Sequence, residues 1–107
     1  MIHNKLVRDK ILEIISKDSV EFKSHILSDE EYKKELLAKI VEEANEVLDT
    51  NGDKNELVKE ISDVMEVLDA IIVAFDLDIA EIVKVKQQRK GSRGGFEKKI
   101  YLESTEE

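Results

Sequence analysis

Two long stretches with helical spacing, joined by a four-residue turn, constrain the fold of this chain more than any other feature. Residues 29–49 and 54–75 repeat apolar side chains at three- and four-residue intervals, which predicts two helices. Ser28 and Glu31 have the spacing of a capping box at the start of the first helix, and an Asn-Gly pair lies at the centre of the turn. A short turn between two long helices predicts an antiparallel helical hairpin.

Two shorter helices are predicted on either side of this hairpin. Apolar residues at helical spacing indicate one helix over residues 7–16. A second helix is expected over residues 79–90, with Asp78 as its N-cap and Gly91 at its end. The chain has no proline, which suits a mostly helical protein. We therefore expect an all-α fold, a four-helix bundle built around the central hairpin.

The length and composition limit what else the chain can contain. With 107 residues it is expected to form one domain over residues 1–107. Residues 19–27 have the composition of either a brief strand or an extended connection, and residues 99–102 that of a short strand, so the two could add a minor β-hairpin. The absence of cysteine excludes disulfides and thiolate metal sites. No apolar run reaches the roughly 18 residues that a membrane span needs, so we expect a cytoplasmic protein without a membrane partner.

The helix predicted over residues 54–75 is apolar around most of its circumference. A chain of this size buries only roughly two-thirds of its unfolded surface, and a lone four-helix monomer would leave part of this helix exposed. We therefore expect a homo-oligomer, most simply a twofold dimer. The apolar residues of this helix are Leu57, Ile61, Val64, Met65, Val67, Leu68, Ile71, Ile72, Val73, Ala74 and Phe75.

Charge is distributed unevenly along the chain. Residues 29–82 carry 17 acidic and 5 basic side chains, whereas residues 83–100 carry 7 basic and 1 acidic. The net charge of −8 argues against a protein that binds nucleic-acid polymers. The acidic region could supply ligands for a cation, and the basic region could bind an anion beside it. Two solvated helix faces of opposite charge are the alternative explanation.

Each helix of the predicted hairpin carries a pair of carboxylates three residues apart. Glu43 and Glu46 lie on the first helix, and Glu60 and Asp63 on the second. At about 100° per residue, Glu43 lies at the margin of its apolar face and Glu60 inside the other. Counted from the turn, the pairs also lie at similar heights, so both should flank one groove and be partly buried. Taken singly, each pair would be interpreted as a solvated surface feature, and it is their matching positions that favour a shared site.

Four converging carboxylates would raise one another's pKa unless a cation lies between them. Neither His3 nor His25 is spaced to join them, and ligation by oxygen alone favours Mg²⁺ or Mn²⁺. Mg²⁺ usually completes its coordination shell with water and substrate phosphates, which suggests a polyphosphate substrate. Two such ions could activate a water and stabilise the departing oxygen.

Basic residues and glycines suggest where phosphates would bind. Arginine, lysine and glycine-exposed N–H groups can grip a phosphate, although an ordinary basic helix end would look the same. Lys5, Arg8 and Lys10, near the start of the chain, either add to such a charge pocket or serve solubility. The residues of the later cluster are Lys84, Lys86, Arg89, Lys90 and Arg93, around Gly91, Gly94 and Gly95.

These residues resemble the signature of a known family. The run Glu42-Glu43-Ala44-Asn45-Glu46, followed after thirteen residues by Glu60-Ile61-Ser62-Asp63, is similar to the EExxE and ExxD motifs of the MazG-like all-α nucleoside triphosphate pyrophosphohydrolases. Residues 4–11 and 93–96 resemble the opening and closing segments of a compact branch related to phosphoribosyl-ATP pyrophosphohydrolase. The likeness spans about residues 3–102. Leu12 departs from it, because the family typically has a proline there.

The resemblance implies an activity and a set of site residues. It implies a Mg²⁺-dependent hydrolase, with Mn²⁺ as a substitute, that splits the α–β phosphoanhydride of a nucleoside triphosphate into a monophosphate and pyrophosphate in a house-cleaning role. It also implies a dimer or a tetramer. Its metal ligands would be Glu43, Glu46, Glu60 and Asp63; Glu42 completes the catalytic set, with its role left open among support, water orientation and a solvent-facing position. The candidate phosphate contacts are Arg8, Lys10, Lys86, Arg89 and Arg93.

Two alternative functions remain open from the sequence. The first is phosphoribosyl-ATP pyrophosphohydrolase itself, in histidine biosynthesis, which uses the same bond chemistry. The second is a non-catalytic acidic helical module that binds a protein partner through the apolar helix. Titration with Mg²⁺ or Mn²⁺ separates this last alternative from the others, since dispersed solvated carboxylates should not bind the ion.

Overall fold

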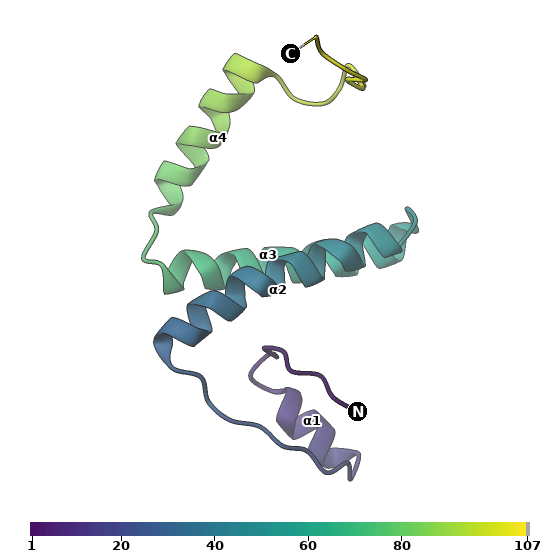
Figure 1. The fold of residues 1–107 in the computed structure, drawn as a ribbon, viewed down its shortest axis with the longest axis vertical. Coiled ribbons are helices and arrows are strands. Elements are labelled where there is room, and N and C mark those ends of the chain that lie inside the picture. Colours follow the sequence, from purple (N-terminus) through teal and green to yellow (C-terminus); the bar gives the residue numbers. More distant parts are fainter. Residues whose placement is uncertain (107) are drawn as a thin grey trace. The chain divides into compact units, whose positions relative to one another are not determined.

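The computed structural model describes residues 1–106, and α-helix is the only regular secondary structure there (Figure 1). The chain divides into two compact units, Met1–Asp76 and Leu77–Glu107. No helix of the described residues is long and apolar enough to cross a membrane. The all-α prediction is thus confirmed, while the single domain over residues 1–107 stays a prediction. The helices are α1 (Ile11–Lys17), α2 (Asp29–Asp49), α3 (Lys54–Ala74) and α4 (Ile79–Arg93).

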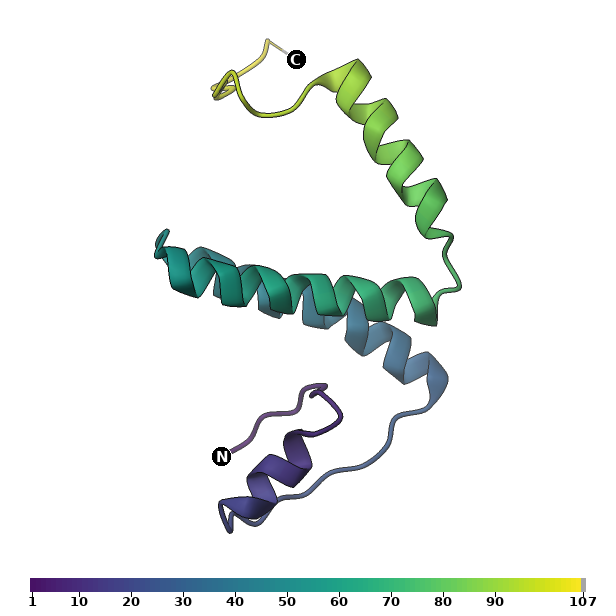
Figure 2. The same ribbon diagram turned by 180° about the vertical axis from the view of Figure 1, so that it is seen from behind.

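The central hairpin is formed by α2 and α3, which lie side by side in both ribbon views (Figures 1 and 2). The capping box at the start of α2 is complete: the Ser28 hydroxyl accepts a hydrogen bond from the Glu31 N–H, and the Glu31 carboxylate accepts one from the Ser28 N–H, both at 3.2 Å. Asp53 caps α3. Gly52 adopts a φ of +87°, which a residue without Cβ tolerates at no steric cost. The predicted turn residues therefore reverse the chain as expected.

The buried part of the hairpin is small and half acidic. Leu36 of α2 and Val67 of α3 are the buried apolar residues, with exposed fractions of 3% and 9%. The other buried side chains are the carboxylates Glu43 and Glu60. Fully buried apolar side chains therefore contribute little to the packing of the two helices that carry the acidic residues.

Two helix boundaries differ from the prediction. The first helix begins at Ile11 and not at residue 7, because the preceding residues form a turn in which the Arg8 carbonyl accepts a hydrogen bond from the Ile11 N–H. The fourth helix continues through Gly91 and ends at Arg93. A glycine only weakens a helix interior, whereas the C-cap residue Gly94 has a φ of +83°, a conformation that favours glycine.

No residue up to 106 is in a strand, so the prediction of short strands over residues 19–27 and 99–102 is wrong, and residues 19–27 form a connection instead. Each segment begins at a residue in the left-handed region, Ser19 at φ +56° and Lys99 at φ +60°, which interrupts an extended backbone. A strand also needs a hydrogen-bonded neighbour, and an isolated two-stranded hairpin is marginally stable at best.

Candidate metal centre

Four carboxylates from the two hairpin helices meet at one place. Glu43 and Glu46 project from consecutive turns of α2, and Glu60 and Asp63 from consecutive turns of α3. One oxygen from each of the four lies within 4.8 Å of the other three. Residues three apart share a helix face, and the antiparallel packing turns the two faces toward each other. The structure thus brings together the four residues that the sequence predicted as metal ligands; their role as ligands stays a proposal.

Two of these carboxylates are buried and incompletely satisfied. Glu43 and Glu60 have exposed fractions of only 7% and 8%. Their Oε2 atoms are buried without a hydrogen-bond partner. A buried carboxylate oxygen without a partner is costly, so such a group needs an explanation in terms of function. The two unpaired oxygens and an all-oxygen set of donors fit a hard divalent cation, which would supply the missing positive partner.

The environment also changes how readily these two groups ionise. Burial, reinforced by the neighbouring Glu46 carboxylate, raises the pKa of the Glu43 carboxyl above its ordinary value. The same two causes, in the same order, raise the pKa of Glu60. A metal ion binds the deprotonated carboxylate, so binding must displace any proton held there. Affinity for a divalent cation should consequently increase as the pH rises through the range in which these carboxyls titrate.

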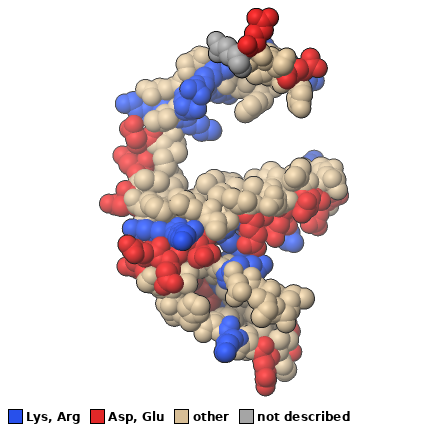
Figure 3. Space-filling view, viewed as in Figure 1, with Lys and Arg blue, Asp and Glu red and all other residues tan. Residues whose placement is uncertain are grey.

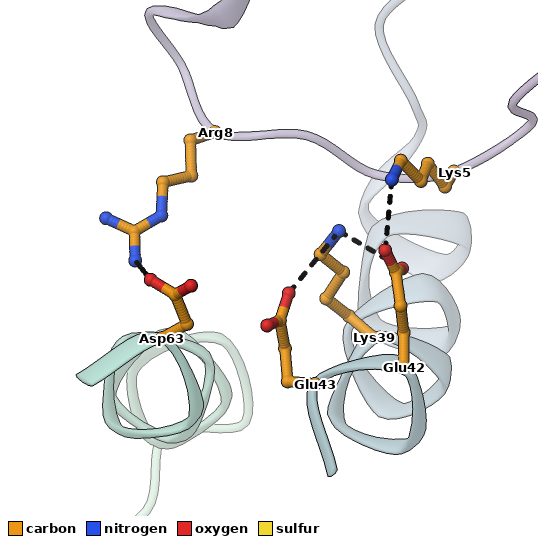
Figure 4. A network of polar contacts seen from close by, with 6 residues as sticks. All are labelled: Lys5, Arg8, Lys39, Glu42, Glu43 and Asp63. Atoms are coloured by element: carbon orange, nitrogen blue, oxygen red, sulfur yellow. Dashed lines mark hydrogen bonds and ion pairs between the residues drawn. The ribbon is translucent and has the colours of Figure 1, made fainter. Parts of the chain in front are cut away.

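Glu42, the first glutamate of the signature, lies outside the group of four. Its two oxygens accept hydrogen bonds from the ammonium groups of Lys5 and Lys39, each at 3.1 Å (Figure 4). Partial burial alone would raise the pKa of the Glu42 carboxyl, but the two lysines together outweigh it and lower the pKa. Two ammonium groups therefore hold the Glu42 carboxylate, which argues against a freely solvated position.

Lys39 is a residue of this site that the sequence analysis missed. Its ammonium group lies between α2 carboxylates, 3.1 Å from Glu42 Oε2 and 3.7 Å from Glu43 Oε1. The side chain is only 14% exposed. The signal was present, because Lys39 precedes these glutamates by three and four residues and so shares their helix face. A single lysine in a charged helix gives no reason to single it out until the neighbouring burial is known.

Only one of the predicted phosphate contacts reaches the carboxylates in the first unit. The Arg8 guanidinium donates a 2.8 Å hydrogen bond from Nη2 to Asp63 Oδ1. Lys10 is instead the N-cap residue of α1 and forms no ion pair among the described residues.

The other three predicted phosphate contacts belong to the second unit. Lys86, Arg89 and Arg93 line an open pocket there, together with Gly94 and Phe96. Basic side chains gather over α4 in the space-filling view, as the charge distribution predicted (Figure 3). The pocket thus places basic side chains beside an aromatic ring and the Glu97 carboxylate, and phosphate binding there stays a prediction.

The fold and the carboxylate group together define a class of protein. An all-α chain in which two antiparallel helices present EExxE and ExxD carboxylates to one another has the architecture of the MazG-like all-α nucleoside triphosphate pyrophosphohydrolases. Residues 8–90 match the family model for phosphoribosyl-ATP pyrophosphohydrolase, and the chain belongs to that family. Its members are hydrolases that cleave a phosphoanhydride. No curated protein and no solved structure matches the chain.

Proposed function

We propose that this protein is a Mg²⁺-dependent pyrophosphohydrolase whose substrate is phosphoribosyl-ATP or a close analogue. The observation that carries the proposal is the family match over residues 8–90, which includes all four clustered carboxylates. The match favours this substrate over the general house-cleaning hydrolysis of nucleoside triphosphates that the sequence analysis placed first. A purely non-catalytic module is disfavoured, because the family is one of hydrolases.

The acidic residues of the site would bind the metal ion, and the basic residue Arg8 would bind substrate phosphate. Mg²⁺, or Mn²⁺ in its place, would be held by Glu43, Glu46, Glu60 and Asp63, and when bound it supplies positive charge to phosphate oxygens. Arg8 lies at the edge of this group, 2.8 Å from Asp63, where its guanidinium can donate to a phosphate. Arg8 would thus help to orient the polyphosphate and offset part of its negative charge, two contributions on which phosphoryl-transfer catalysis mainly depends.

The substrate proposal can be tested by comparing phosphoribosyl-ATP with a panel of ribo- and deoxyribonucleoside triphosphates in the presence of Mg²⁺. We expect pyrophosphate release with kcat/KM at least about tenfold higher for phosphoribosyl-ATP than for ATP, because the phosphoribosyl group offers contacts that ATP lacks. The measurement is a coupled assay for pyrophosphate, with parallel detection of orthophosphate.

Two results would change this assignment. Equal kcat/KM values across the triphosphate panel would favour the house-cleaning function. Release of orthophosphate alone would show that a different phosphoanhydride is cleaved. Protein carrying Glu60→Gln, purified in the same way, controls for contaminating phosphatases.

We also propose a homo-oligomer, either a dimer or a tetramer. Support comes from apolar side chains of α3 that remain well exposed within one chain: Val58, Ile61, Met65, Leu68 and Val73, at 45% to 81%. Exposed apolar area on this scale is typical of a surface covered by another subunit. Sedimentation equilibrium at micromolar concentration should give a mass at least twice that of the chain; the mass of a monomer would contradict the proposal.

A further inference from the structure

The segment that precedes α1 makes contact with both helices of the hairpin. Lys5 donates a hydrogen bond to Glu42 of α2, and three residues later Arg8 donates one to Asp63 of α3. Figure 4 shows both side chains reaching from this segment toward the two helices. The partners are 37 and 55 residues away in sequence, so these contacts depend on the tertiary fold and not on local structure.

The two carboxylates that this segment contacts differ in their surroundings. Asp63 belongs to the group of four carboxylates, whereas Glu42 does not. Glu42 is also fixed from its own helix, because Lys39 donates to its second oxygen at 3.1 Å and is itself largely buried. Glu42 is therefore a carboxylate held in place on α2 that offers its other oxygen to the segment before α1.

We infer that the Lys5–Glu42 contact fastens residues 1–10 to α2 and thereby places the Arg8 guanidinium at the edge of the carboxylate group. Lys5, Glu42 and Lys39 are then positioning residues, while Arg8 is the group that meets the substrate phosphates. This inference rests on the proposed function for what Arg8 does, but not for where it lies. It assigns a role to Glu42, and it adds Lys5, which lies before the first residue of the family match.

Ion pairs that are weak individually can still hold residues 1–10 on the hairpin. Lys5 is 42% exposed and Glu42 30%, so a single ion pair of this kind contributes little free energy. The two contacts lie on one short segment, however, and forming the first raises the effective concentration of the second. Removing Lys5 should consequently loosen Arg8 as well, although Arg8 itself is unchanged.

The position of the segment can be measured directly, because the chain has no cysteine of its own. Ile2→Cys and Asn55→Cys, both exposed, place one spin label on the segment and one at the start of α3. Labelled chains are mixed with an excess of unlabelled protein so that labels on other subunits do not contribute, and double electron–electron resonance should then give a narrow distance distribution. Lys5→Met and Glu42→Gln should each broaden it, Lys5→Arg should keep it narrow, and the control Lys23→Met should leave it unchanged.

Kinetics supply the second measurement. In the unlabelled protein we expect Lys5→Met to raise KM for the substrate about threefold to fivefold with little change in kcat, since an ion pair of this strength is lost and the carboxylates remain. Lys5→Arg should restore KM. Equal distance distributions in all variants would overturn the inference while leaving the hydrolase proposal intact. A protein with the expected distances but no hydrolysis of any substrate would instead contradict the proposed function.

Discussion

Asp63→Asn is expected to lower the rate of pyrophosphate release by at least about 100-fold, and Glu60→Gln should do the same. Even partners that only support metal ligands are worth 10- to 100-fold in affinity or activity, and these two residues would be ligands themselves. Each substitution removes a negative charge and one oxygen from a group whose members lie within 4.8 Å of one another. Single-turnover assays with Mg²⁺ measure the loss of rate. Calorimetric titration with Mn²⁺ measures the accompanying loss of metal affinity. Glu66→Gln, on the exposed face of α3, is the matched control and should keep full activity.

The same Glu60→Gln variant should be more stable than the parent protein when a chelator removes divalent ions. Burial raises the pKa of Glu60, so the folded state is penalised whenever this carboxyl is charged. The penalty is absent below the ordinary pKa of 4.5, where the group is protonated in both states, and is complete above the raised pKa. Thermal unfolding midpoints should therefore differ at neutral pH and converge in acid. A variant that is inactive and also less stable at neutral pH would indicate a structural role for Glu60.

Leu36→Ala is expected to destabilise the protein by about 2–5 kcal/mol, a large part of the roughly 5–15 kcal/mol that holds a typical domain folded. Leu36 is 3% exposed and is one of two buried apolar residues among residues 1–106. Loss of its side chain would leave a cavity in the small core of the unit that carries both pairs of carboxylates. Urea unfolding followed by circular dichroism measures the free energy of unfolding, and Mn²⁺ titration reports whether the site survives.

The neighbouring residue provides the control for this experiment. Leu37 has the same side chain in the same helix but is 50% exposed, so Leu37→Ala should cost less than about 1 kcal/mol. Equal losses for the two variants would contradict the assignment of Leu36 as a core residue.

Much of the carboxylate arrangement was predictable because it follows from local rules. Helical periodicity, the Ser28 capping box and the Asn-Gly turn together specify two antiparallel helices of known length. Once that hairpin is accepted, the positions of Glu43 and Glu60 relative to the turn determine that they face each other. The pairs on α2 and α3 could therefore be expected to converge before any coordinates were known.

Residues three or four positions apart specify the helices, their caps and the faces that carry the acidic pairs, so these features could be predicted without coordinates. The contacts of Lys5 with Glu42 and of Arg8 with Asp63, and the absence of strands up to residue 106, are known only from the folded chain. The physical reason is that contacts between residues 37 and 55 positions apart depend on how the elements pack. For Lys5 and Arg8, unlike Lys39, no local spacing indicates the distant carboxylates that they contact.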